Sequence, residues 1–89
     1  MNKLELEERT IFKELSRISR RNPELFDKID KTLTRVIKKM DEVEKLRAKG
    51  FDASLDTELK LLLAIFKNAL ISRNEKVVKE TVEEIEKLV

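Results

Sequence analysis

Apolar residues recur along this chain at spacings of three and four, the period of an amphipathic α-helix. In the first third, Leu4, Ile11, Leu15 and Ile18 predict a helix over about 3–21. Past a proline, a second apolar seam predicts a helix over about 23–49, with core residues Phe26, Ile29, Leu33, Val36, Met40 and Val43. Its spacing is typical of a helix that lies nearly parallel to a neighbour.

Two more apolar stripes follow in the second half of the chain. Leu55, Leu59, Leu62, Phe66 and Ala69 predict a helix over about 54–72. The positions that mark the inner face of a last helix, over about 74–89, are Val78, Val82, Ile85 and Val89. No alternating run of strand-forming residues is bounded by turn residues.

Residues that begin and end helices separate these stripes. Asn22 and Pro23 have the chemistry of an N-cap and a first helical position. Gly50 followed by Phe51 is typical of a helix end, where glycine adopts a left-handed conformation and an apolar residue packs behind it. The remaining candidates for N-caps are Asp52, Ser54 and Asp56 before the third helix, and either Ser72 with Glu75 or Asn74 alone before the fourth. The prediction is an all-α fold: one domain over 1–89, an antiparallel bundle of four helices.

Composition narrows the function classes. Charged residues make up 43% of the chain, and His, Cys, Trp and Tyr are absent. Without His or Cys, the usual bases, nucleophiles and metal ligands are missing, so we expect no enzyme, no catalytic residue, no metal, no cofactor and no small-molecule substrate. The longest apolar stretch, Leu61 to Phe66, is far shorter than the about 18 residues of a membrane span, so we expect a cytoplasmic protein with no membrane partner. The abundance of Lys and Glu is typical of thermophilic proteins.

Positive charge is concentrated in the first half of the chain. Residues 9–39 hold ten cations and four acids, a net charge of +6, whereas residues 41–89 carry −2. Cations recur at every fourth position, a spacing at which like charges repel on a helix. The expected basic face, for nucleic acid or an acidic partner, comprises Arg9, Lys13, Arg17, Arg20, Arg21, Lys31, Arg35, Lys38 and Lys39.

Two interpretations of this basic face stay open. In the simpler one it is a solvated surface, paired in part with acids four residues away and with Glu80 to Glu86 of a neighbouring helix. In the other it neutralises phosphates. All four phenylalanines lie on core stripes or at a helix cap, so none is expected to be free for stacking on bases.

The third helix carries an apolar arc about 200° wide, roughly twice what one buried face requires. Either this helix is central and touches two or three neighbours, or its surface continues into a contact with another chain. The residues of that expected interface are Leu61, Ile65, Asn68 and Ser72.

The function that these features favour is binding. We expect a small non-enzymatic interaction or accessory subunit that docks to itself or to a protein partner through the third helix and presents the basic face. The alternative is a nonspecific nucleic-acid-binding protein that uses the basic face.

Overall fold

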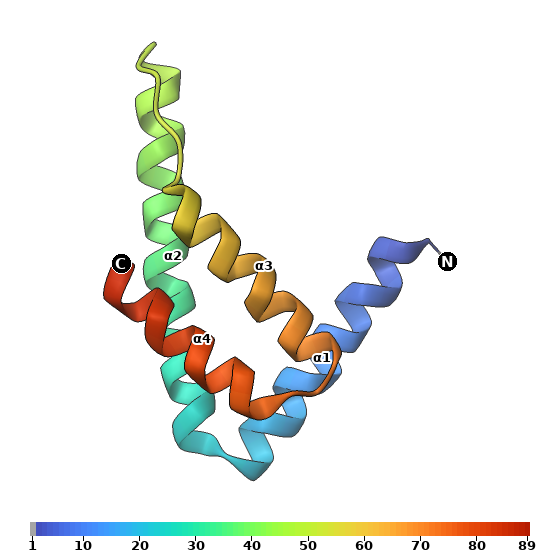
Figure 1. Ribbon diagram of the computed structural model, residues 1–89. Coiled ribbons are helices and arrows are strands. Elements are labelled where there is room, and N and C mark those ends of the chain that lie inside the picture. The colour runs from blue at the N-terminus through green and yellow to red at the C-terminus, as the bar shows by residue number, and fades with distance from the viewer. Residues whose placement is uncertain (1) are drawn as a thin grey trace.

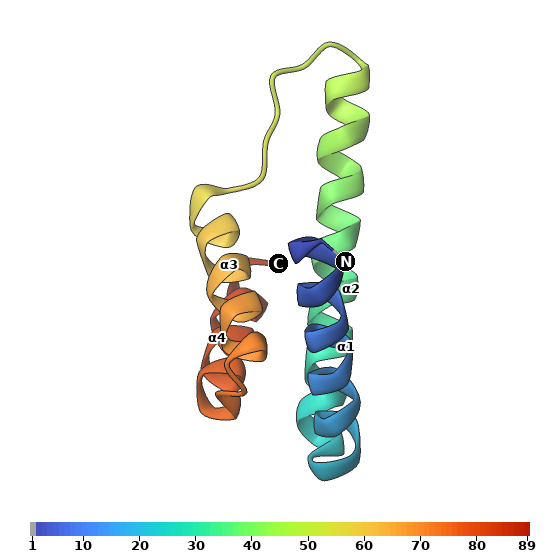
Figure 2. The ribbon, with the colours of Figure 1, turned by 90° about the vertical axis from the view of Figure 1, so that its right-hand side faces the viewer.

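The computed structural model describes residues 2–89, which form four α-helices in two layers (Figures 1 and 2). The helices are α1 (Lys3–Arg21), α2 (Pro23–Ala48), α3 (Thr57–Ile71) and α4 (Glu75–Leu88). The predicted all-α fold of four helices is confirmed, and residues 2–89 contain no strand. No predicted helix bound differs from the observed bound by more than three residues.

Each layer is a hairpin whose two helices run in opposite directions and diverge from their turn (Figure 1). The hairpin of α1 and α2 stands behind that of α3 and α4, and Figure 2 shows the two layers side by side. Helix α1 packs against α2 and α3, and α4 packs against α2 and α3. The result is a flat molecule of 44 × 34 × 18 Å.

The core lies where the two hairpins cross. Its fully buried side chains come from all four helices: Ile18, Ile29, Leu59, Leu70, Val78, Val82 and Ile85. Phe66 and Ala69 complete the α3 contribution, as their stripe predicted. Phe26 and Leu33 pack against this cluster while staying partly exposed.

The helix ends follow the predicted turn chemistry. Asn22 Oδ1 accepts a hydrogen bond from Leu25 N (3.2 Å), and Pro23 is the first residue of α2. Gly50 has φ of 91°, and Phe51 N donates to Leu46 O (3.0 Å), the bond that closes a Schellman motif. The third helix begins later than position 54 because Asp56 is its N-cap, accepting from Glu58 N.

The fourth helix has the simpler of its two predicted caps. Asn74 Oδ1 accepts from Val77 N (3.3 Å), whereas the Ser72 hydroxyl donates backwards to the carbonyl of Asn68 (2.9 Å). Asn74→Ala should therefore lower the free energy of unfolding by about 1 kcal/mol, and Ser72→Ala by less than about 0.5 kcal/mol. Urea unfolding of the two variants measures this difference, and an equal loss in both would contradict the assignment of the cap.

Helix α2 extends well beyond the helix that covers it. It has 26 residues and α4 has 14, so α2 is about 18 Å longer than α4. From Ile37 to Asp52 every side chain except that of Val43 is exposed. The prediction that Met40 belongs to the core is wrong: it is 49% exposed, because no helix packs over that part of the seam. Val43 is only half-buried.

Candidate binding surfaces

The cations of α1 and those of α2 form two separate groups. Arg20 and Lys13 of α1 line a hollow with Arg73, which precedes α4. Arg35 of α2 lines a different hollow with Glu83 and Glu86, in the last two turns of α4. The predicted basic residues therefore lie towards opposite ends of α4, in surroundings of different charge.

On α2, the basic residues are surrounded by acids and carbonyls. Lys31 Nζ lies 2.9 Å from Asp27 Oδ2, and Lys28 Nζ lies 3.5 Å from Glu83 Oε1 and 3.7 Å from Glu86 Oε2. The expected pairing of this helix with the acids of a neighbour is confirmed for Lys28. Lys39 Nζ donates to Leu88 O (2.9 Å), and Lys38 is exposed.

On α1, one cation is held in a buried network. Glu14 is only 2% exposed, and Arg17 donates hydrogen bonds from Nε to both of its carboxylate oxygens (3.1 and 3.0 Å) and another from its terminal nitrogen. The third member is Arg73, whose Nε lies 3.8 Å from Glu14 Oε2. The network ties α1 to the turn between α3 and α4.

The hydrogen bonds from Arg17 hold the pKa of Glu14 below its ordinary value, although burial of the carboxyl acts in the opposite direction. The same bonds raise the pKa of Arg17, with a smaller contribution from Glu75. Glu14 is therefore ionised at neutral pH. In the charge pattern Glu14 is only one acid among cations, yet its position seven residues after Glu7 and four before Ile18 places it on the inner stripe of α1.

The other basic residues of α1 remain exposed beside an aromatic side chain. Arg9, Lys13, Arg20 and Arg21 are all exposed. Phe12 is 69% exposed and lines the same hollow as Lys13 and Arg20. The prediction that no phenylalanine is free is wrong, because Phe12 lies beside the core stripe and not on it; Phe51, at its helix cap, is exposed as well.

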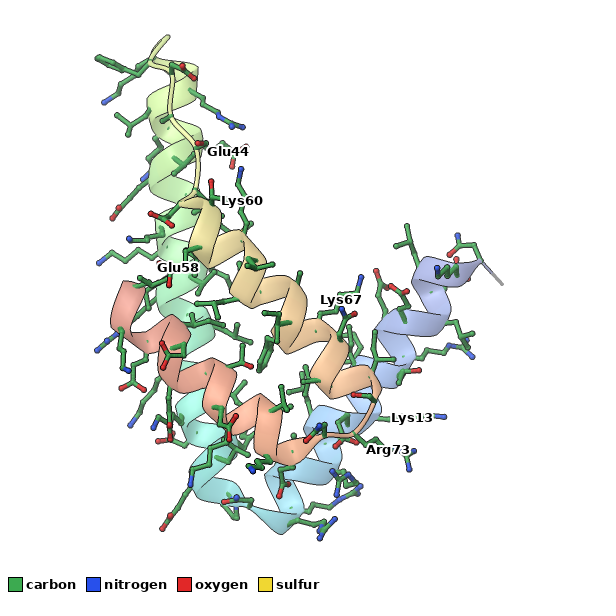
Figure 3. The ribbon with its side chains drawn as sticks, in the orientation of Figure 1. Lys13, Glu44, Glu58, Lys60, Lys67 and Arg73 are labelled. Atoms are coloured by element: carbon green, nitrogen blue, oxygen red, sulfur yellow. The ribbon has the colours of Figure 1, made fainter. Side chains whose placement is uncertain are left out.

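The predicted interface residues of α3 lie on its outer side. Leu61 is 60% exposed, and Ile65, Asn68 and Ser72 are exposed too. The opposite side of α3 packs against α1 and α4, so the explanation of its wide apolar arc by neighbouring helices is confirmed, and contact with another chain stays a prediction. Figure 3 shows Lys60 and Lys67 on the edge of α3; Lys67 Nζ pairs with Glu7 Oε2 at 3.0 Å.

A groove separates the projecting half of α2 from the start of α3. Its volume is about 380 Å³, and Met40, Val43 and Leu55 supply the apolar part of its lining. Charged side chains of both signs complete it; they are Glu44, Arg47 and Lys60. Figure 3 shows Glu44 and Lys60 on the same side of the molecule.

Comparison of the chain with protein-family models, with curated proteins and with solved structures found no match. Among the described residues, no helix is long and apolar enough to cross a membrane, and no three His, Cys, Asp or Glu side chains gather as a metal site would require.

Proposed function

We propose that this protein is a non-enzymatic interaction subunit that pairs with a second copy of itself. The contact surface comprises the projecting half of α2, residues 37–48, and the outer face of α3 around Leu61 and Ile65. The observation that carries the proposal is the exposure of an apolar seam on α2 beyond the end of α4. Met40 of that seam is 49% exposed, and Ile37 and Leu46 are exposed on either side of it.

The accessible surface supports a partner of standard size. One chain exposes 6648 Å², whereas a compact monomer of 10.5 kDa exposes about 5,400 Å². The excess of about 1,200 Å² exceeds the roughly 800 Å² that one partner buries in a typical stable interface. A contact of that size over the two apolar surfaces would bring the chain closer to the exposure expected of its mass.

The charges of the projecting half favour a second copy over a strongly charged partner. In the projecting half, two cations precede and two follow a group of three acids, Asp41, Glu42 and Glu44. Opposite charges are thus available on both copies, and a two-fold axis can bring unlike charges together. The exposed cations of α1, in contrast, would repel their own copies.

A binding role also fits the acid and base chemistry of the chain. Glu14 is the buried carboxylate of the described residues, and its lowered pKa keeps it ionised. It pairs with two arginines and is ionised, so it has no proton to donate at neutral pH.

Substitution at the proposed interface tests this function. In light scattering at micromolar concentrations, the protein should have twice the mass of one chain, and Met40→Glu or Leu61→Glu should halve that mass. Both side chains are about half or more exposed, so the helical circular dichroism of the variants should be unchanged. Thr34→Glu is the matched control, because it places the same charge at an exposed position of α2.

Two results would refute the proposal. One is a wild-type protein that is a monomer at all concentrations tested. The other is a dimer that neither substitution weakens.

A further inference from the structure

An exposed phenylalanine stands among cations on the outer face of α1. By the 100° rotation of each helical residue, Arg9, Lys13 and Arg20 lie within about 100° of Phe12 around the helix. The hollow beside them has a volume of about 430 Å³. It is lined by Phe12, Lys13, Ser16, Arg17, Arg20 and Arg73.

The turn between α3 and α4 adds a cation from a different part of the chain. Arg73 has φ of 57°, the left-handed conformation in which glycine is favoured at the end of a helix. Asn74 N donates to Ala69 O (2.9 Å), the same Schellman bond that Gly50 permits at the end of α2. Arginine thus occupies a position where glycine is preferred, and Figure 3 shows its side chain on the same side of the molecule as Lys13.

The positive charge of this face is largely free. The ion pairs among residues 2–89 include none with Arg9, Lys13 or Arg20, and the side chain of Arg73 is 72% exposed. The nearby acids are Glu14, which Arg17 neutralises, the partly buried Glu75, and the exposed Glu8, which lies one turn before Phe12 and about 40° from it around the helix. An approaching anion therefore meets several cations and one aromatic ring.

We propose that this face binds single-stranded nucleic acid, with Phe12 stacking on a base while Lys13, Arg20 and Arg73 contact phosphates. A single strand offers an unpaired base to an exposed aromatic ring, whereas a duplex keeps its bases stacked inside. An acidic protein would use the cations alone and would leave Phe12 without a role. The face is separate from the proposed dimer contact, so this inference does not depend on self-association.

Fluorescence anisotropy with a labelled thymidine oligonucleotide of about 16 nucleotides tests the proposal, at about 50 mM salt. We expect binding that weakens as salt rises, and weaker binding to a duplex of the same length. Phe12→Ala should weaken binding about 5- to 150-fold, the range measured for loss of one stacked aromatic. Phe51→Ala is the matched control, because it removes an equally exposed ring elsewhere and should change binding less than about twofold.

Arg73→Gly separates the site from the stability of the fold. The variant removes a phosphate contact, so the slope of log affinity against log salt should fall by about 0.7. Glycine is suited to the left-handed φ at this position, so the helical circular dichroism should be retained. Lys87→Gln, in the last turn of α4 and outside both proposed surfaces, is the charge control and should leave the slope unchanged.

Three outcomes would overturn the proposal. The first is no binding of the oligonucleotide at about 50 mM salt. The second is binding that Phe12→Ala leaves unchanged. The third is equal affinity for polyglutamate, which would assign the face to acidic proteins.

Discussion

Leu70→Ala should lower the free energy of unfolding by about 2–5 kcal/mol, because it leaves a cavity where the two hairpins cross. Leu70 is 1% exposed, and the core that surrounds it draws on all four helices. A chain of this length has a total stability of roughly 4–13 kcal/mol, so the loss is a large fraction of the whole. Urea unfolding followed by circular dichroism measures it.

Leu6→Ala is the control for this substitution. Leu6 is one of the exposed leucines of α1, and its truncation should change the free energy of unfolding by less than about 0.5 kcal/mol. Equal losses at the two positions would mean that the core does not lie where the hairpins cross.

Glu14→Gln should lower the free energy of unfolding by about 2–4 kcal/mol at neutral pH, because it removes the buried carboxylate to which the partly buried Arg17 donates its hydrogen bonds. The effect should depend on pH in a defined direction. The pKa of Glu14 is lowered in the folded protein, so its contribution is present above the ordinary pKa of a glutamate, about 4.3, and is lost as the pH falls through the lowered value.

Urea unfolding of the wild type and of Glu14→Gln at pH 7 and at progressively more acidic pH tests this. The difference between the two proteins should shrink in acid. Glu80→Gln, at an exposed carboxylate of α4, should be close to neutral at every pH. A difference for Glu14→Gln that does not vary with pH would contradict an ionised carboxylate in the network.

The helices and their ends could be predicted because they depend on local chemistry. Asn22 caps α2, whose first residue is Pro23, and Gly50 lies in the turn that ends this helix. Asn22 and Gly50 both act through hydrogen bonds with backbone groups three residues away. Such interactions are encoded within one turn of helix, so sequence spacing is enough to locate them.

Burial along α2 could not be predicted in the same way. The apolar spacing from Phe26 to Val43 is continuous, yet cover stops near Val36, where the shorter α4 ends. Periodicity predicts which side of a helix is apolar. Whether that side is buried depends on the length and the crossing of the neighbouring helix. The exposure of Met40 follows from this mismatch.

The surface of α1 shows the same limit at the candidate sites. The basic residues and the apolar face of α3 were found from spacing alone, since both are periodic. Spacing alone does not place Arg73 beside Lys13. The two residues lie 60 positions apart in sequence and line the same hollow only in the folded chain. Glu14 was missed for a related reason: its second partner comes from that turn.

In the proposed dimer, a second copy covers the apolar surfaces that one chain leaves exposed. Sedimentation equilibrium of the wild-type protein over a range of micromolar concentrations tests it most directly. We expect a mass of twice 10.5 kDa that falls towards 10.5 kDa only on dilution. A constant mass of one chain across the range would contradict it.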